Sequence, residues 1–193
     1  MFTGIVEALG KVEEIKRVGE NIDLRISSKI SHTLEVNQSL NHDGVCLTIT
    51  DFDKNQHWVT AVKETLDKSS LKHFQVGQLV NLERAMPSSG RFDGHIVQGH
   101  VDTIGNVVDI SEQDGSWLYT FSFDYPSALI VEKGSICING VSLTCFDVTD
   151  KSFRVAIIPH THEKTNFNKF LKGTPVNLEF DIIGKYISRL IKK

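Results

Sequence analysis

The feature that most constrains this sequence is an internal repeat. The phrase NHDGVCLTIT, which begins at residue 41, returns 96 residues later as CINGVSLTCF. When residues 39–84 are laid over residues 135–180 without gaps, fifteen of the forty-six positions are identical, and the identities are spread along the whole stretch. The start of the chain repeats as well, because GIVEALGKV at residue 4 matches GHVDTIGNV at residue 99. A repeat on this scale predicts two copies of one module.

Each module has the pattern of a small β domain. Its short runs alternate apolar and polar residues or are rich in β-branched residues, as in NIDLRIS, HWVTAV, LVNLER, LYTFSF, SFRVAII and PVNLEF. About six short strands per module, without alternating helices, favour a closed Greek-key barrel. The predicted fold class is therefore all-β, with two similar six-stranded Greek-key barrels from an internal duplication and a C-terminal amphipathic helix.

Composition indicates where the modules divide. The segment MPSSGRFDG, residues 86–94, clusters Pro, Ser and Gly as exposed linkers do. We therefore expect one barrel over residues 1–94, a second over 95–181 and a helix over 182–193. That helix would cover a barrel mouth or pack against its own copies in an oligomer. Two polar stretches, KETLDKSSLKHF and HTHEKTNFNKF, each predict one short helix inside a barrel.

Bulk properties exclude several classes of protein. The chain is 40% hydrophobic and 23% charged, its net charge is −3, and its Lys and Arg residues are scattered. These values are typical of a folded globule with a small-molecule or protein partner, and they argue against a nucleic-acid partner. No apolar run approaches the ~18 residues of a membrane span, so we expect a cytoplasmic protein. Three cysteines without a CxxC spacing indicate reduced thiols without a metal.

The repeat also identifies candidate functional positions, because duplicated sites that divide their roles keep a framework and change reactive groups. The reactive groups differ at three pairs of matched positions: Cys46 against Ser142, His100 against Ile5, and His160 against Glu64. In the phrase G-V-[CS]-L-T, alternation along a strand places Cys46 and Thr48 on one face. From this phrase alone, a ligand site and a bulged strand start with small packing residues are equally open.

Other polar residues have structural explanations. In GHIVQGHVD, His95 and His100 are five residues apart and would lie on opposite faces of a strand, so a shared metal is not expected. A lone histidine on a strand is more often structural than functional. Lys133 precedes a turn and is typical of a solvated surface, and Asp181 is placed to cap the terminal helix.

Seven short motifs, taken in order over the whole chain, resemble riboflavin synthase, the family built from two lumazine-binding repeats. These motifs are MFTGIVE, S-x-x-x-x-G-V-C-L-T, KET, NLERA, GHIVQGHVD, NGVSLT and IPHT. The resemblance implies a dismutation in which one 6,7-dimethyl-8-ribityllumazine gives a four-carbon unit to a second. The products are riboflavin and 5-amino-6-(D-ribitylamino)uracil, and the family uses no cofactor or metal. Its members are homotrimers in which the first barrel of one subunit faces the second barrel of a neighbour.

The resemblance also implies site residues, which we carry over by position. For the first barrel they are Gly4, Ile5, Val6, Cys46, Leu47, Thr48, Thr60, Ala61, Val62, Lys63, Glu64 and Thr65. For the second barrel they are Gly99, His100, Val101, Lys133, Ser142, Leu143, Thr144, Ala156, Ile157, Ile158, Pro159, His160 and Thr161. Positions associated with catalysis are Phe2, Ser39, Cys46 and His100. Three residues depart from the family's pattern: Asp93, His162 and Asn166.

The chemistry of this reaction suggests roles for some of the residues implied by the resemblance. The reaction needs a proton removed from one 7-methyl group and a nucleophile added to the other ring, and aligned stacking of the two rings contributes to both steps. His100 is a candidate for proton transfer, while Cys46, Ser39 and water remain open as the nucleophile.

Two other functions compete with this reading. A non-catalytic lumazine or flavin antenna protein of the same fold would be expected to lose the reactive residues, which this chain retains. A flavin-dependent reductase is disfavoured because no GxGxxG phrase follows a strand.

Overall fold

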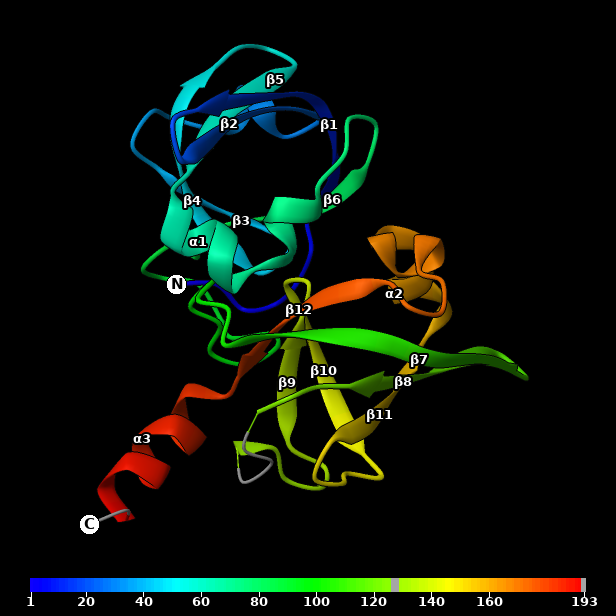
Figure 1. The fold of residues 1–193 in the computed structure, drawn as a ribbon. Coiled ribbons are helices and arrows are strands. Elements are labelled where there is room, and N and C mark those ends of the chain that lie inside the picture. Colours follow the sequence, from blue (N-terminus) through cyan, green and yellow to red (C-terminus); the bar gives the residue numbers. More distant parts are fainter. Residues whose placement is uncertain (126–128, 192–193) are drawn as a thin grey trace.

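The chain folds into two closed six-stranded barrels followed by a helix, as seen in a computed structural model that describes residues 1–125 and 129–191. In Figure 1 the first barrel lies above the second, and the terminal helix extends from the lower barrel at the left. The fold class predicted from the repeat is confirmed. The assignment of exact domain boundaries at residues 94 and 181 stays a prediction.

The first barrel follows the strand order β1-β2-β5-β4-β3-β6 and closes by pairing β6 with β1. Its elements are β1 (Ala8–Val18), β2 (Asn21–Ser28), η1 (Ser31–Thr33), β3 (Ser39–His42), β4 (Val45–Phe52), β5 (Gln56–Ala61), α1 (Lys63–Lys68), η2 (Ser70–His73) and β6 (Leu79–Arg84). All neighbouring strands are antiparallel.

The second barrel repeats this topology strand for strand. Its elements are β7 (Thr103–Gln113), β8 (Ser116–Ser122), β9 (Ser135–Ile138), β10 (Val141–Phe146), β11 (Ser152–Ile157), α2 (Pro159–Lys164), η4 (Asn166–Lys169) and β12 (Pro175–Phe180). The bulge of the first strand is repeated, because register shifts occur after Val12 in β1 and after Val107 in β7. The register shift after Ile49 in β4 has no counterpart in β10. Bulges bend and twist a strand, which helps both long first strands to curve around a small barrel.

The two cores are built from different side chains. The first is mainly aliphatic, with Leu24, Ile26 and Ile49 fully buried. The second is rich in aromatic rings, and Tyr119 and Phe121 are among its largest buried side chains. Edge-to-face ring contacts, such as Tyr119 with Phe167 at 5.3 Å between centroids, fill the second barrel.

The predicted helices are present. Both polar stretches form a short α-helix followed by a 3₁₀ turn, and α3 (Ile182–Ile191) follows β12 directly. The Asp181 carboxylate accepts a hydrogen bond from the Ile183 N–H at 3.0 Å, which confirms its capping role. The last two residues of the predicted terminal helix lie outside the described residues. On α3, Tyr186 and Leu190 are 66% and 76% exposed.

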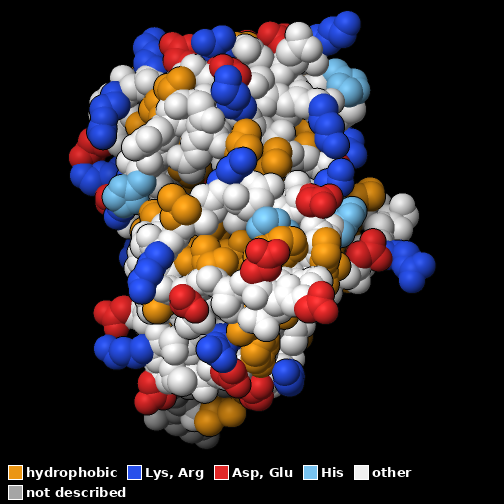
Figure 2. All heavy atoms as spheres, turned by 90° about the vertical axis from the view of Figure 1, so that its right-hand side faces the viewer, with side chains coloured by type: hydrophobic (Ala, Val, Ile, Leu, Met, Phe, Trp, Pro, Cys, Tyr) orange, Lys and Arg blue, Asp and Glu red, His pale blue; other side chains and the backbone are white. Residues whose placement is uncertain are grey.

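Charged residues of both signs are spread over the face shown in Figure 2, and hydrophobic side chains gather around the middle of the molecule. On this face the two signs are mixed, without a stripe of one sign. Within the described part of the chain, no helix has the length and apolar character needed to cross a membrane.

The seam between the barrels is a buried network of amide and carboxyl groups. Asn81 donates from Nδ2 to the Asn139 carbonyl at 2.9 Å, and Asn177 donates from Nδ2 to the Asp43 carbonyl at 2.7 Å. These two bonds are equivalent under the repeat, so an approximate twofold axis passes between the barrels. The departure at Asn166 belongs to this seam, since its N–H donates to Asn81 Oδ1 at 2.8 Å.

Candidate functional site

Two segments cross from one barrel to the other. The segment before β1 belongs in sequence to the first barrel, yet its Gly4 carbonyl accepts a hydrogen bond from the Ser142 N–H of the second at 2.8 Å. In the same way, the Gly99 carbonyl before β7 accepts from the Cys46 N–H of the first barrel at 2.8 Å. Each crossing segment is therefore hydrogen-bonded to the opposite barrel.

This crossing corrects the grouping expected from the sequence. We expected Gly4 to Val6 beside Cys46, and Gly99 to Val101 beside Ser142; the structure exchanges the two segments. Gly4 and Gly99 have φ angles of 79° and 80°, and a Cβ added to either would lie 2.6 Å from the Cβ of Ser142 or Cys46 respectively. Only glycine allows both the backbone conformation and the close approach.

Two buried glutamates hold the crossing segments in place. Glu83 accepts hydrogen bonds from the N–H groups of Thr3 and Gly4 at 2.6 and 3.0 Å. Glu179 accepts from the N–H groups of residues 98–100 at 2.7, 2.9 and 3.0 Å. Burial raises the pKa of both carboxyls, and the N–H bonds oppose this by stabilising the charged form. Sequence reasoning missed them, although a glutamate repeated within apolar VNLE strands was a usable signal.

The first pocket, of about 350 Å³, lies where the crossing segment with Gly99 meets the first barrel. Its lining combines β4, α1 and that segment: Val45, Cys46, Glu64, Thr65, Lys68, Ser69, Gly99, His100 and Val101. Six of these nine are residues expected from the sequence. The pocket therefore brings a thiol, an imidazole, a carboxylate and an ammonium group to one small opening.

The second pocket, of about 410 Å³, lies at the matched place beside the second barrel. Its lining is Val6, Glu7, Ala8, Leu9, Lys29, His160, Glu163 and Lys164. Val6, His160 and Lys164 correspond under the repeat to Val101, Glu64 and Lys68 of the first pocket. Of the expected residues only Val6 and His160 line it directly.

Ser142 is bonded to the histidine that sequence reasoning treated as structural. His95 Nδ1 lies 2.6 Å from Ser142 Oγ, and burial lowers the pKa of His95, with Asp181 acting in the opposite direction. The expected strand across GHIVQGHVD is wrong, because apart from a bridge at Val97 this stretch is irregular. The expectation that the two imidazoles face different places is confirmed, since His100 lines the pocket of the first barrel.

Phe2 and Ser39 flank the first pocket without lining it. Phe2 is fully buried, packs with Val97 and Cys137, and has Cys46 against the same cluster. Its burial favours a role in positioning Cys46. Ser39 pairs with Thr48 on the outer face of β3 and β4, which is the face that carries Cys46.

The remaining expected residues fall into three groups. The core holds Leu47, Ala61 and Ile157, while Leu143 packs partly against it. Side-chain or backbone bonds engage Thr60 with Asp23, Lys63 with Glu20, and Thr161 with Thr165. The exposed group is Ile5, Thr48, Val62, Lys133, Thr144, Ala156, Ile158 and Pro159. Lys133 lines neither pocket, and its ammonium group lies 4.7 Å from the centroid of the Phe146 ring.

The departure at His162 builds a stack that the first barrel lacks. Its ring lies parallel to Trp117, with the centroids 3.8 Å apart and the planes inclined by 5°. The matched positions of the first barrel hold Ile22 and Leu66. The stack fixes α2, which carries His160, against β8.

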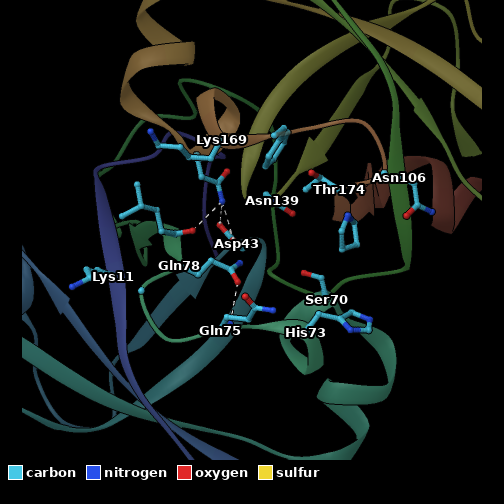
Figure 3. Close-up of a pocket in the computed structure, with 16 residues that line it drawn as sticks. Lys11, Asp43, Ser70, His73, Gln75, Gln78, Asn106, Asn139, Lys169 and Thr174 are labelled. Atoms are coloured by element: carbon cyan, nitrogen blue, oxygen red, sulfur yellow. Dashed lines mark hydrogen bonds between the residues drawn. The ribbon is translucent and has the colours of Figure 1, made fainter.

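A cavity larger than either pocket lies between the barrels, and none of the expected site residues lines it (Figure 3). We found no group of three or more His, Cys, Asp or Glu side chains suited to a metal among the described residues.

The chain is similar to known proteins in both sequence and fold. The lumazine binding domain family matches the chain twice, over residues 3–85 and 98–181. Riboflavin synthases of Actinobacillus pleuropneumoniae and Bacillus subtilis are each 43% identical over 196 residues, covering 100% of this chain and 91% of theirs. The riboflavin synthase of Schizosaccharomyces pombe is 40% identical over 197 residues, covering 100% of this chain and 94% of its own. The fold is shared with LumP in complex with 6,7-dimethyl-8-(1'-D-ribityl) lumazine, with a TM-score of 0.85 and 20% identity over 93% of this chain and 98% of LumP.

Proposed function

This chain belongs to the riboflavin synthase family, and we propose how its two unlike pockets divide that family's reaction. Its activity is that of a riboflavin synthase. Two molecules of 6,7-dimethyl-8-ribityllumazine react, and one riboflavin and one 5-amino-6-(D-ribitylamino)uracil are formed. A cytoplasmic location stays a prediction.

The observation that carries the proposal is the pairing of a repeated framework with unrepeated reactive groups. The first pocket holds Cys46 and His100, whereas the matched positions in the second half are Ser142 and Ile5. A dismutation needs two copies of one molecule to react differently. We therefore assign one substrate to each pocket, with similar binding and different chemistry.

In the first pocket, His100 and Cys46 have separate roles. The His100 N–H is fixed by Glu179 at 3.0 Å, so the imidazole is presented from an anchored backbone. A neutral imidazole accepts a proton near neutral pH, and a carbon acid such as the 7-methyl group needs such an acceptor. Cys46 supplies a thiol to the same opening and is a candidate nucleophile toward the ring.

In the second half of the chain, Ser142 and His160 occupy the positions that match Cys46 and Glu64, and of these two only His160 lines the second pocket. The Ser142 hydroxyl is hydrogen-bonded to His95, while α2 brings the His160 imidazole to the pocket. This pocket lacks a thiol among its described lining residues, which suits it to hold a substrate without forming a bond to carbon.

The reaction also requires the two rings to meet, and we propose that they do so in a homotrimer. Apolar side chains near the pockets are exposed: Ile5 at 46%, Val62 at 49% and Ile158 at 59%. The apolar face of α3 is exposed as well, which favours contact between copies of the chain. Sedimentation of the full chain should give a trimer, and removal of residues 182–193 should give monomers.

The activity is tested by mixing purified protein with 6,7-dimethyl-8-ribityllumazine alone. We expect riboflavin and the uracil product to appear in equal amounts without any added cofactor. Tight binding of the lumazine with no riboflavin formed would instead assign the chain to the non-catalytic antenna class.

A further inference from the structure

Glu7 and Asp102 occupy matched positions at the ends of the two crossing segments, and Asp102 follows His100 by two residues. Each carboxylate accepts a hydrogen bond from the main chain where a barrel ends. The Arg84 N–H at the end of β6 donates to Glu7 at 3.0 Å, and the Phe180 N–H at the end of β12 donates to Asp102 at 2.8 Å. Each carboxylate therefore ties the end of a crossing segment to the final strand of the barrel that the segment leads into.

The positive charge that pairs with each carboxylate comes from a different place in the two halves. In the first half Arg84 itself provides it, because its Nε donates to Glu7 at 2.7 Å. The matched residue Phe180 is apolar and buried, and Lys185 of α3 instead donates from Nζ to Asp102 at 2.6 Å. The helix α3 continues from the end of β12 (Figure 1), whereas the described residues between β6 and β7 form no helix. A helix outside the repeat thus takes the place of an arginine on the strand.

The bond from Lys185 to Asp102 is shielded from water. The two side chains are 21% and 14% exposed, compared with 40% and 31% for Arg84 and Glu7. Water and salt therefore screen the pair in the second half less than the pair in the first. Removal of the lysine would leave a largely buried carboxylate without its cation, which is the costly way to break an ion pair.

Lys185 also acts on the other carboxyl that holds this crossing segment. Glu179 accepts hydrogen bonds from the N–H groups of residues 98–100. Burial raises the pKa of Glu179, whereas those N–H bonds and the positive charge of Lys185 act in the opposite direction. The lysine therefore favours the charged form of the carboxyl that binds the segment, in addition to its own bond to Asp102.

We propose that Lys185 is a positioning residue for the synthase reaction, and that it holds residues 98–102, and with them the His100 imidazole, from the terminal helix. The inference rests on the proton-transfer role proposed above for His100. That residue lies between the backbone bound by Glu179 and the carboxylate bound by Lys185, so loss of the ammonium group frees one end of a short segment. The helix α3 then contributes to the first pocket of its own chain, in addition to any contact between copies.

Steady-state kinetics with 6,7-dimethyl-8-ribityllumazine test this role. Lys185→Met should lower kcat about tenfold and change KM less than about twofold, because alignment of His100 is lost while the lining of the pocket is kept. Lys185→Arg retains a cation for Asp102 and should keep kcat within about twofold of the native value. Arg189→Met is the matched control, since it removes a cation from an exposed position of the same helix, and it should leave kcat unchanged.

Two further measurements separate positioning from folding and assembly. Lys185→Met should sediment as the native chain does. Hydrogen exchange followed by mass spectrometry should be severalfold faster over residues 98–102 of Lys185→Met, because exchange reports local opening of the backbone. Over the same residues, Lys185→Arg should exchange at the native rate.

Failure of this role and failure of the proposed function give different results. Absence of riboflavin from the native chain would contradict the proposed function. With an active native chain, native turnover or native exchange in Lys185→Met would overturn the role of Lys185. Equal slowing in Lys185→Met and Arg189→Met, a Lys185→Arg variant as slow as Lys185→Met, or a loss of turnover that appears only with dissociation would overturn it as well.

Discussion

The two barrels share a backbone plan but differ in what they bury. The first barrel buries a pair of histidines, with His42 Nε2 and His57 Nε2 only 2.9 Å apart. The matched positions of the second barrel are Ile138 and Phe153, both fully buried. Duplication has therefore preserved strand order, while side chains in the core and the pockets have diverged.

The histidine pair is satisfied when both rings are neutral. The Ser31 hydroxyl can donate to His57 Nδ1 at 3.1 Å, and His57 Nε2–H can then donate to His42 Nε2. The His42 Nδ1–H donates in turn to the Leu40 carbonyl at 3.1 Å. This single chain of donors and acceptors has no place for an additional proton, which distinguishes the first barrel from the apolar interior of the second.

The same comparison applies at the pockets. The crossing segments, their glycines and their glutamates are matched in both halves, so the framework is symmetric. Cys46 and His100 are not matched, so the chemistry is asymmetric. We infer that binding of two identical substrates depends on the framework that the two halves share. Their different roles in the reaction depend on a few side chains that differ between the halves.

The largest effect is expected from adding a methyl group to a crossing glycine. Gly99→Ala combines a positive φ with a contact of 2.6 Å to Cys46 Cβ, and Gly4→Ala does the same against Ser142. Each should lower the free energy of unfolding by about 4 kcal/mol, the sum of backbone strain and overpacking. Urea unfolding measures this. Gly19→Ala, with a φ of 62° and nothing near its Cβ, is the control and should cost about 1 kcal/mol. Unequal losses at residues 4 and 99 would contradict a symmetric framework.

The next effect separates the chemistry of the pockets. Cys46→Ser should slow turnover about 100-fold, equivalent to about 2.7 kcal/mol of barrier, because a reactive group is lost. Ser142→Ala should slow it less than about tenfold, because only a hydrogen bond is lost. Steady-state rates at saturating lumazine measure both. Equal slowing by the two changes would contradict divided roles.

A smaller effect is expected on how the stability of each barrel depends on pH. Burial lowers the pKa of His57 from its usual value of 6.5 to about 4, and burial also lowers the pKa of His42, with His57 contributing. Between pH 6.5 and pH 4 these histidines bind protons in the unfolded chain but not in the folded chain. The free energy of unfolding is therefore highest above pH 6.5 and falls as the pH drops toward 4. His57 alone should cost about 2 kcal/mol at pH 5 relative to pH 8.

The two tryptophans make this measurable in each barrel, because Trp58 lies in β5 and Trp117 in β8. Urea unfolding at pH 8 and pH 5 is followed in Trp117→Phe, which reports on the first barrel, and in Trp58→Phe, which reports on the second. The loss of stability at pH 5 should be larger for the first barrel. A Trp58 signal without pH dependence would refute the account of the histidine pair.

The smallest effect concerns the stack of Trp117 on His162. His162→Leu copies Leu66 of the first barrel and should lower the free energy of unfolding by about 1 kcal/mol, the usual value of a stacked pair beyond its buried area. Unfolding followed by Trp117 emission measures it. His32→Leu, at an exposed histidine in η1, is the control and should have no comparable effect. A stability unchanged by His162→Leu would show that the stack does not fix α2.

Much of this fold could be predicted from the sequence, because the repeat and the alternation of residues are local signals. The strand NIDLRIS and the two short helices are examples. The exchange of the segments carrying Gly4 and Gly99 could not be predicted, since it depends on contacts with the opposite barrel that no local pattern encodes. The Glu83 and Glu179 clamps were missed although the repeated VNLE strands carried a signal, because the N–H groups that they bind lie far away in the sequence. Cys46 and His100 were found because the repeat isolates them as unmatched.

The central claim is that each chain has two substrate pockets, alike in framework and unlike in chemistry. It is tested most directly by equilibrium titration with a lumazine analogue that lacks the 7-methyl group and so cannot react. The account predicts two analogues bound per chain with different affinities, one lost in Gly4→Ala and the other in Gly99→Ala. A single analogue per chain, or loss of the same site in both variants, would contradict it.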